Sequence, residues 1–184
     1  MSKLAINGGK KVRERLFPAH VTTGGEELAA VQKVLSSGIL SNYLGANHEN
    51  FMGGHTVRKF EDACWDFWEV EHSLAVNSNT SGLITALGAL ELAPLDEVLV
   101  VAYSMTISAT APLFWGAIPV FVDVEDDYFC MDPKKIEAEI TDKTKAILVV
   151  NLFGQVYDFI KINAIAKKYG LFVIEDSAQA PLLK

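Results

Sequence analysis

The residues with the clearest chemical potential form an acidic segment near the end of the chain, Glu175-Asp176-Ser177-Ala178-Gln179-Ala180. The segment follows an apolar run of strand length, and a carboxylate at the end of a buried strand is costly unless something compensates its charge. Magnesium could do so, but the Gly-x-x-x-x-Gly-Lys-[Ser/Thr] loop that usually accompanies such chemistry is missing. A cationic ring nitrogen, such as the pyridinium of pyridoxal phosphate (PLP), is a second candidate, because a nearby carboxylate keeps it protonated. A third interpretation is that Asp176 only caps the following turn.

A second polar segment, Asn77-Ser78-Asn79-Thr80-Ser81-Gly82, lies between an apolar run and a predicted helix. Small hydroxyl and amide side chains at this point cap a helix and leave backbone N–H groups pointing outward. Together with the positive end of the helix dipole, they are suited to holding a phosphate. A plain helix cap explains the same residues, so this segment alone does not decide between the two interpretations.

Other common chemistries find little support in the sequence. It contains neither a Gly-x-Gly-x-x-Gly dinucleotide fingerprint nor a Gly-x-Ser-x-Gly nucleophile elbow. His48, His55 and His72 do not have a metal-ligand spacing, and no metal site is expected. Cys64 and Cys130 are far apart and form no Cys-x-x-Cys pair, which disfavours a zinc site or a disulfide framework.

The elements that must position the two polar segments alternate between strand and helix from residue 72 onward. Apolar runs predict strands at residues 73–76, 98–101, 118–122, 146–150 and 171–174. Helical spacing is found at residues 80–92, 106–115, 133–140 and 159–169. Runs that are apolar on both faces, separated by crossover helices, predict a parallel sheet with helices on each side, the doubly wound α/β class. In such sheets ligands bind beyond the carboxyl ends of the strands, where both polar segments are expected.

The first 71 residues have a different pattern and are predicted to be an N-terminal extension to the domain of residues 72–184. Residues 26–37 have the spacing of an amphipathic helix, and Gly38 is a plausible stop. Residues 38–55 are rich in Gly, Asn and His and are predicted to form a loop. A second helix is predicted at residues 56–69.

Composition and charge disfavour nucleic-acid-binding and membrane proteins. The chain has 184 residues and a formal net charge of −7, which gives it no broad electrostatic affinity for nucleic acid. No apolar run reaches the roughly 18 residues needed to cross a bilayer, and the N-terminus lacks the apolar core of a signal peptide. These features predict a soluble protein of a reducing compartment, the cytoplasm.

Taken in chain order, the segments resemble the DegT/DnrJ/StrS group of sugar aminotransferases, which are fold-type I PLP enzymes. The resemblance extends over essentially the whole chain. The segments that carry it are residues 4–10, 37–41, 57–61, 77–81, 117–123, 151–155 and 175–180.

The resemblance implies a role for each matching position. Asp176 would pair with the pyridine nitrogen, and Gln179 would lie near the phenolic oxygen of the ring. Asn79, Thr80 and Ser81 would surround the phosphate. In such enzymes an amino acid, commonly glutamate or glutamine, donates its amine to a nucleotide-linked keto-sugar or a keto-cyclitol. Members are usually homodimers whose active sites take residues from both subunits.

The sequence departs from the family pattern at two positions near the cofactor. Asn79 stands where members often have Gly. The aromatic residue that commonly stacks on the ring is replaced by Met105 or Ile107, depending on where a gap is placed.

The third departure concerns the Schiff-base lysine, which in the family lies a few tens of residues beyond the Asp. Only eight residues follow Asp176, so Lys184 comes too early to be that lysine. The resemblance therefore implies an N-terminal half that is poorly stable and inactive alone. It also implies a gap between the strand that precedes Ser78 and the strand that carries Asp176, since the strands that separate them in the family are missing.

Three alternatives remain open at this stage. The chain could be an inactive subunit that lends residues 38–56 to a full-length paralogue. It could belong to the related PLP-dependent sugar dehydrases, in which His replaces the lysine. It could also be an unrelated phosphate-binding α/β module.

Overall fold

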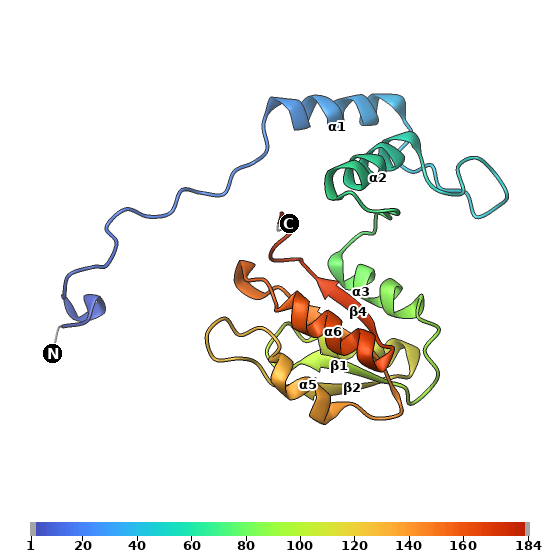
Figure 1. Cartoon of the computed structure of the whole chain (residues 1–184). Coiled ribbons are helices and arrows are strands. Elements are labelled where there is room, and N and C mark those ends of the chain that lie inside the picture. Colours follow the sequence, from blue (N-terminus) through green and yellow to red (C-terminus); the bar gives the residue numbers. More distant parts are fainter. Residues whose placement is uncertain (1–2, 183–184) are drawn as a thin grey trace. The chain divides into compact units, whose positions relative to one another are not determined.

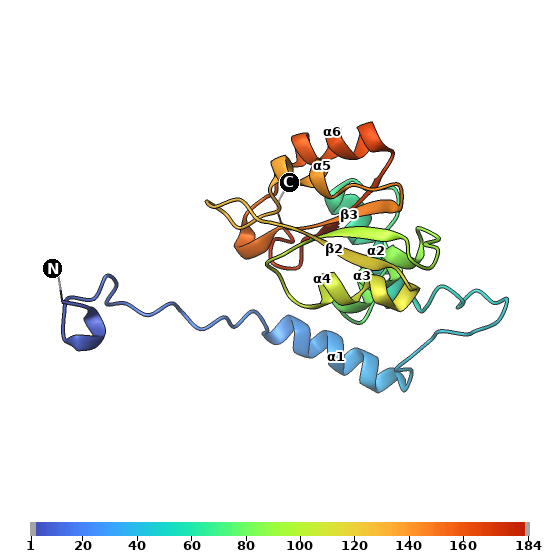
Figure 2. The ribbon, with the colours of Figure 1, turned by 90° about the horizontal axis from the view of Figure 1, so that it is seen from below.

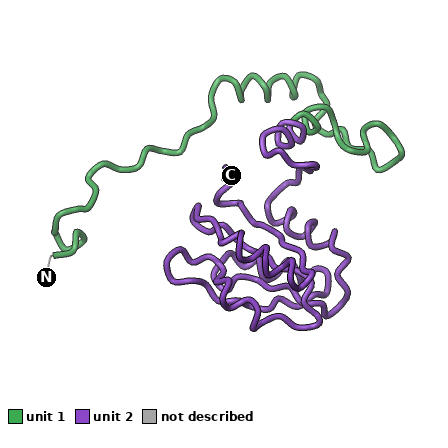
Figure 3. Tube along the Cα trace, in the orientation of Figure 1, with its two compact units in different colours: residues 1–59 green, residues 60–184 purple. Residues whose placement is uncertain are grey.

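The computed structural model describes residues 3–182, so Lys184 lies outside the described residues. The chain divides into two compact units, Met1–Lys59 and Phe60–Lys184 (Figure 3). No helix within residues 3–182 is both long and apolar enough to cross a membrane.

The first unit holds the short 3-10 helix η1 (Ala5–Asn7), helix α1 (Gly25–Ser37) and the start of helix α2 (His55–Trp68) (Figure 1). The predicted stop at Gly38 is confirmed: this residue caps α1 with a left-handed backbone, φ 69°, which glycine adopts without steric cost. Helix α1 buries none of its residues, although its sequence is amphipathic.

The second unit contains the remaining elements and the parallel sheet. Its helices are α3 (Asn79–Gly88), α4 (Ile107–Thr110), α5 (Pro133–Glu139) and α6 (Phe159–Tyr169), with 3-10 turns η2 (Pro112–Trp115) and η3 (Leu152–Gly154). Its strands are β1 (Glu97–Val101), β2 (Ile118–Val122), β3 (Thr144–Val150) and β4 (Phe172–Asp176).

The four strands are parallel and lie in the order β2-β1-β3-β4. Helices α5 and α6 cover one face and α3 and α4 the other (Figure 2). The connection from β2 to β3 passes over β1, so the chain changes direction between β1 and β3. The predicted doubly wound α/β class is therefore confirmed.

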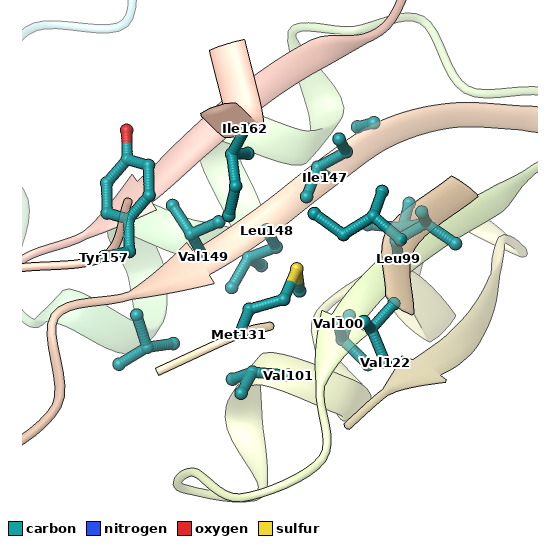
Figure 4. Packing of buried hydrophobic residues seen from close by; sticks show 14 of the residues in the cluster. Leu99, Val100, Val101, Val122, Met131, Ile147, Leu148, Val149, Tyr157 and Ile162 are labelled. Carbon is teal, nitrogen blue, oxygen red and sulfur yellow. The ribbon is translucent and has the colours of Figure 1, made fainter. Parts of the chain in front are cut away.

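The core lies around the two central strands, as their continuous apolar sequences predict. Residues 98–101 of β1 and 146–150 of β3 are all buried and pack with Met131, Ile136 and Ile162 from the surrounding segments (Figure 4). Each fully buried large aliphatic side chain contributes on the order of 1.5–3 kcal/mol relative to an exposed one. This rigid centre holds the strand ends that carry the candidate site.

Two local predictions differ from the structure. The helix expected over residues 106–115 is split into α4 and η2, because Pro112 has no N–H to continue an α-helix. The strand expected at residues 73–76 does not form in the described chain, since no strand lies beside it. One of its backbone groups, the Ala75 N–H, donates to Glu61 Oε1 at 2.8 Å instead.

Candidate cofactor site

The two polar segments identified in the sequence meet at the carboxyl end of β4. Asp176 is the last residue of β4, and Asn79 is the first residue of α3. The Asn79 Nδ2 atom donates a hydrogen bond to Asp176 Oδ1 at 3.0 Å. No strand of residues 3–182 pairs with the outer edge of β4, as the expected gap implies, but α3 packs beside β4 and brings Asn79 to Asp176.

Asp176 is buried, with 5% of the residue exposed, but only one of its carboxylate oxygens is hydrogen-bonded within residues 3–182. Its Oδ1 atom also accepts from the backbone N–H of Ala178 at 3.0 Å, which fixes the side chain against the following turn. Within residues 3–182 no hydrogen bond reaches Oδ2, and that part of the chain has no unpartnered polar side-chain atom that is fully buried. Oδ2 is thus accessible from outside and free to accept a bond from a cationic donor.

The start of α3 presents a second set of groups. Ser78 caps the helix through its Oγ atom, which accepts from the Ser81 N–H at 3.2 Å, and the Ser81 hydroxyl donates to Asn77 Oδ1 at 2.6 Å. The N–H groups of Asn79 and Thr80 donate to no atom of residues 3–182. These free donors lie at the positive end of the helix dipole, where an anion is favoured.

Gln179 is placed differently from the other four predicted site residues. Its Oε1 atom accepts a hydrogen bond from the backbone N–H of Phe153 in η3 at 2.7 Å. Gln179 therefore joins the turn after β4 to the turn after β3. In this arrangement it makes no hydrogen bond to Asn79, Thr80 or Ser81.

A cleft of about 430 Å³ opens where these elements meet. Its volume is within the range of about 300–1,000 Å³ that is typical of small-molecule sites. The lining residues come from α2, α3, the end of β4 and the segment after it: Trp68, Asn79, Glu175, Ser177, Ala178, Ala180 and Pro181. The Trp68 indole N–H donates to the Pro181 carbonyl at 3.0 Å and so holds one wall of the cleft.

Sequence reasoning missed a polar network on the other side of β4. The Asn151 Nδ2 atom donates to Glu175 Oε1 at 2.7 Å and to Ser177 Oγ at 2.9 Å. The Tyr157 hydroxyl donates to Glu175 Oε2 at 3.3 Å. The available signals were that Asn151 directly follows an apolar strand and begins segment 151–155 of the family resemblance; Tyr157 gave no signal.

Burial is the main reason that the Tyr157 hydroxyl is hard to ionise. It raises the pKa of Tyr157 to about 12, and the negative charge and hydrogen bond of Glu175 add to the effect. The phenol therefore stays neutral at physiological pH and acts as a hydrogen-bond donor to Glu175.

The structure also separates the two candidates for the ring-stacking position. Ile107 is half-buried and packs against the core cluster. Met105 is 70% exposed, just beyond the carboxyl end of β1. Of these two side chains, Met105 is the one that remains available to a ligand.

The fit of a pyridoxal-type cofactor can be tested on these groups. An accessible oxygen of a buried carboxylate suits a protonated ring nitrogen, and free N–H groups at the start of α3 suit a phosphate. The two sets lie on adjacent elements that are joined by the hydrogen bond from Asn79 to Asp176. The donor set fits the group.

The fold defines the class of protein: a doubly wound α/β unit in which a buried carboxylate at a strand end lies beside the start of a helix. The model of the DegT/DnrJ/EryC1/StrS aminotransferase family matches residues 22–182. The chain belongs to that family, whose fold is that of the fold-type I PLP enzymes.

Individual relatives agree with this assignment. The chain is 38% identical over 180 residues to an L-glutamine:2-deoxy-scyllo-inosose aminotransferase of Streptomyces lividus, covering 96% of this chain and 41% of the relative. It is 44% identical over 131 residues to a UDP-N-acetyl-3-dehydro-alpha-D-glucosamine 3-aminotransferase of Acidithiobacillus ferrooxidans, covering 71% of this chain and 36% of the relative. The chain thus spans about two fifths of the length of these curated relatives.

A solved structure links the same fold to a cofactor. NtdA from Bacillus subtilis, with bound cofactor PMP (pyridoxamine phosphate), matches with a TM-score of 0.75 and 35% identity, over 83% of this chain and 33% of that one. The expected cofactor class, pyridoxal phosphate and its amine form, is therefore that of the family.

Proposed function

We propose that this chain provides the cofactor-binding part of an aminotransferase that transfers an amine from an amino acid to a keto-sugar or keto-cyclitol. The observation that carries the proposal is the hydrogen bond between Asn79 and Asp176. It brings a buried carboxylate and the free N–H groups of a helix start into one site, as a ligand with a cationic ring and a phosphate requires.

In this proposal each site residue has a defined task. Asp176 accepts the ring N–H through Oδ2 and keeps the nitrogen protonated, while Thr80 and Ser81 bind the phosphate through N–H and hydroxyl groups. Gln179 holds the turn after β3 and reaches the phenolic oxygen after a rotamer change. When bound, the cofactor supplies an electron-withdrawing ring that stabilises negative charge beside the transferred nitrogen.

The relatives suggest the substrate class. One of the two relatives described above is named for a cyclitol ketone with glutamine as donor, and the other for a UDP-linked keto-sugar. We therefore propose glutamine or glutamate as donor and a small keto-sugar or keto-cyclitol as acceptor, in the cytoplasm, with neither nucleic acid nor membrane as a partner. Residues 72–184 would form the cofactor-binding domain, and residues 1–71 an extension that completes the site of a homodimer.

The chain alone is proposed to bind the cofactor without catalysing transfer. None of the cleft-lining residues in the described part of the chain is a lysine. A lysine is needed to hold the aldehyde form covalently and to carry the proton. Binding of the amine form needs no such bond, so PMP is the appropriate probe.

Calorimetric titration of the 184-residue chain with PMP tests the proposal. We expect saturable binding at one site, with much weaker binding of pyridoxamine, which lacks the phosphate. Asp176→Asn should lower the affinity for both ligands, and Thr80→Val should lower it for PMP alone.

A matched control is Asp158→Asn, which changes a carboxylate at the start of α6, outside the cleft. It should bind PMP as the wild type does. Equal binding of PMP by the wild type and by Asp176→Asn would refute the proposed site.

A further inference from the structure

Asn151 is among the most deeply buried polar residues of the described chain, with 1% of its surface exposed. It directly follows β3, and residues 146–150 of β3 pair with the whole length of β4. A buried side-chain amide is costly unless its donors and its acceptor are satisfied. The position of Asn151 next to the proposed site therefore calls for an explanation.

Asn151 forms hydrogen bonds with three consecutive residues, 175–177. Its Nδ2 atom donates to the side chains of Glu175 and Ser177, at 2.7 and 2.9 Å. Its backbone N–H donates to the carbonyl of Asp176 at 3.0 Å. The side-chain oxygen of Asn151, Oδ1, accepts from the Tyr157 N–H at 3.0 Å, which fixes the amide orientation.

These contacts act on the side of the chain opposite the Asp176 side chain. Successive side chains of a strand point to opposite faces, so Glu175 and Ser177 point toward Asn151 while Asp176 points toward Asn79. Fixing the two neighbours fixes the direction of the Asp176 Cα–Cβ bond. The carboxylate thereby needs no contact with Asn151 to be oriented by it.

We infer that Asn151 is a positioning residue, which holds residues 175–177 so that the Asp176 carboxylate faces the ring nitrogen of the cofactor. The inference rests on the proposed function and extends it to a residue outside the cleft. It also gives the Ser177 hydroxyl a role, because this group donates to Glu175 Oε1 at 2.6 Å and so links the two side chains that Asn151 holds.

Two substitutions separate positioning from stability. Asn151→Asp keeps the shape and the acceptor for Tyr157 but replaces the donor by a negative charge beside Glu175. Asn151→Ser is uncharged and has one donor, so it cannot hold both neighbours and should show the same change more weakly even if Asn151→Asp fails to fold. The control is Thr144→Val, at the opposite end of β3, where the Thr144 Oγ1 atom accepts from the Thr141 N–H at 2.9 Å.

Three measurements on the full chain form the test. Amide hydrogen exchange at Ala178 without cofactor reports the bond to Asp176 Oδ1, and it should become faster in the Asn151 variants. Calorimetry with PMP should show about tenfold weaker binding in Asn151→Asp, the effect of one lost charge-assisted hydrogen bond. Nitrogen NMR of ring-labelled PMP should show reduced ring protonation in the bound state. Thr144→Val should match the wild type in all three.

The outcomes are distinct. Folded Asn151 variants with wild-type exchange at Ala178, affinity and ring protonation would overturn the inference and leave the proposed function intact. A Thr144→Val control that changes as much as the Asn151 variants would also overturn the inference, since the effect would then be one of general stability. A wild-type chain that binds no PMP would overturn the proposed function, and the inference with it.

Discussion

Asn79 Nδ2 and Asp176 Oδ1 lie 3.0 Å apart, although 97 residues separate them in the sequence. The contact joins the start of α3 to the end of β4, two elements that no backbone ladder connects. Because Asp176 is buried, this neutral donor compensates part of the cost of keeping its charge there. One hydrogen bond thus stabilises the second unit and assembles the proposed site.

Removing the donor should destabilise the chain measurably. We expect Asn79→Ala to lower the free energy of unfolding by about 1 kcal/mol. This is less than the usual contribution of a hydrogen bond to a charged group, because Asn79 is exposed. Urea denaturation followed by circular dichroism measures it. Thr85→Ala, an exposed position in the same helix, is the control and should change the free energy little. Equal effects of the two substitutions would show that the contact is not a stabilising one.

The raised pKa of Tyr157 predicts a loss of stability in alkali. Burial and Glu175 raise this pKa from 10.0 to about 12, so the folded state holds the phenolic proton more tightly than the unfolded state does. The contribution is complete below pH 10 and is lost as the pH rises toward about 12. Across this interval the wild type should lose on the order of 2 kcal/mol through this group.

Tyr157→Phe removes the titrating group and should flatten that part of the profile. Urea unfolding of both proteins between pH 9 and about 12 measures the difference. Ultraviolet titration provides a direct check, because the wild type should show a phenolate step near pH 12 that Tyr157→Phe lacks. Parallel alkaline profiles for the two proteins would contradict the assignment.

Asp158 should stabilise α6 in a pH-dependent way. Its Oδ1 atom accepts from the Lys161 N–H at 3.1 Å, and its Oδ2 atom lies 2.6 Å from Lys161 Nζ. The side-chain bond to Lys161, followed by the backbone bond, lowers the pKa of Asp158 below 3.8. The stabilisation is therefore present above pH 3.8 and is lost as the pH falls through the lowered value.

Two variants divide this effect into its parts. Asp158→Ala should cost about 1 kcal/mol at neutral pH, the usual value of an N-cap, and less in acid, because protonated Asp158 keeps the cap oxygen but loses the ion pair. Asp158→Asn keeps the cap and loses only the exposed ion pair, so its cost should be smaller. Thermal unfolding at pH 7 and at a pH well below 3.8 distinguishes them. A penalty for Asp158→Ala that does not depend on pH would contradict the role of the charge.

Much of the fold follows from local sequence. The strands of residues 98–101 and 118–122 and the helix of residues 159–169 were predicted nearly to the residue, because apolar runs and helix caps are local signals. Residues 73–76 show the limit of that reasoning. A strand exists only beside a partner, and an apolar sequence does not tell whether the partner is there.

The candidate site could be located from the sequence for a similar reason, and only in part. Asp176 and Thr80 stood out because a strand end and a helix start are recognisable positions with chemical consequences. The contact of Asn79 with Asp176 and the grip of Asn151 on residues 175–177 depend on which strands are neighbours. That order, β2-β1-β3-β4, is a tertiary property that hydrophobic spacing does not specify.

Close packing at the end of α3 yields the last prediction. A Cβ atom added to Gly88 would lie 2.3 Å from Trp115 Cζ2, and the indole is held in place because its N–H donates to the Ile84 carbonyl at 2.7 Å. At Gly82, earlier in the same helix, an added Cβ would meet only Val76 Cγ2, at an ordinary 3.6 Å.

The two glycines should therefore respond in opposite directions. Gly88→Ala should lower the free energy of unfolding by about 1–3 kcal/mol, because it displaces a large ring from a packed position. Gly82→Ala should raise it by up to about 1 kcal/mol, since alanine restricts the unfolded chain and favours the helix. Urea denaturation of the two variants, with tryptophan fluorescence to follow the indole, measures both. If Gly88→Ala proved as stable as Gly82→Ala, the contact between α3 and Trp115 would be looser than the structure shows.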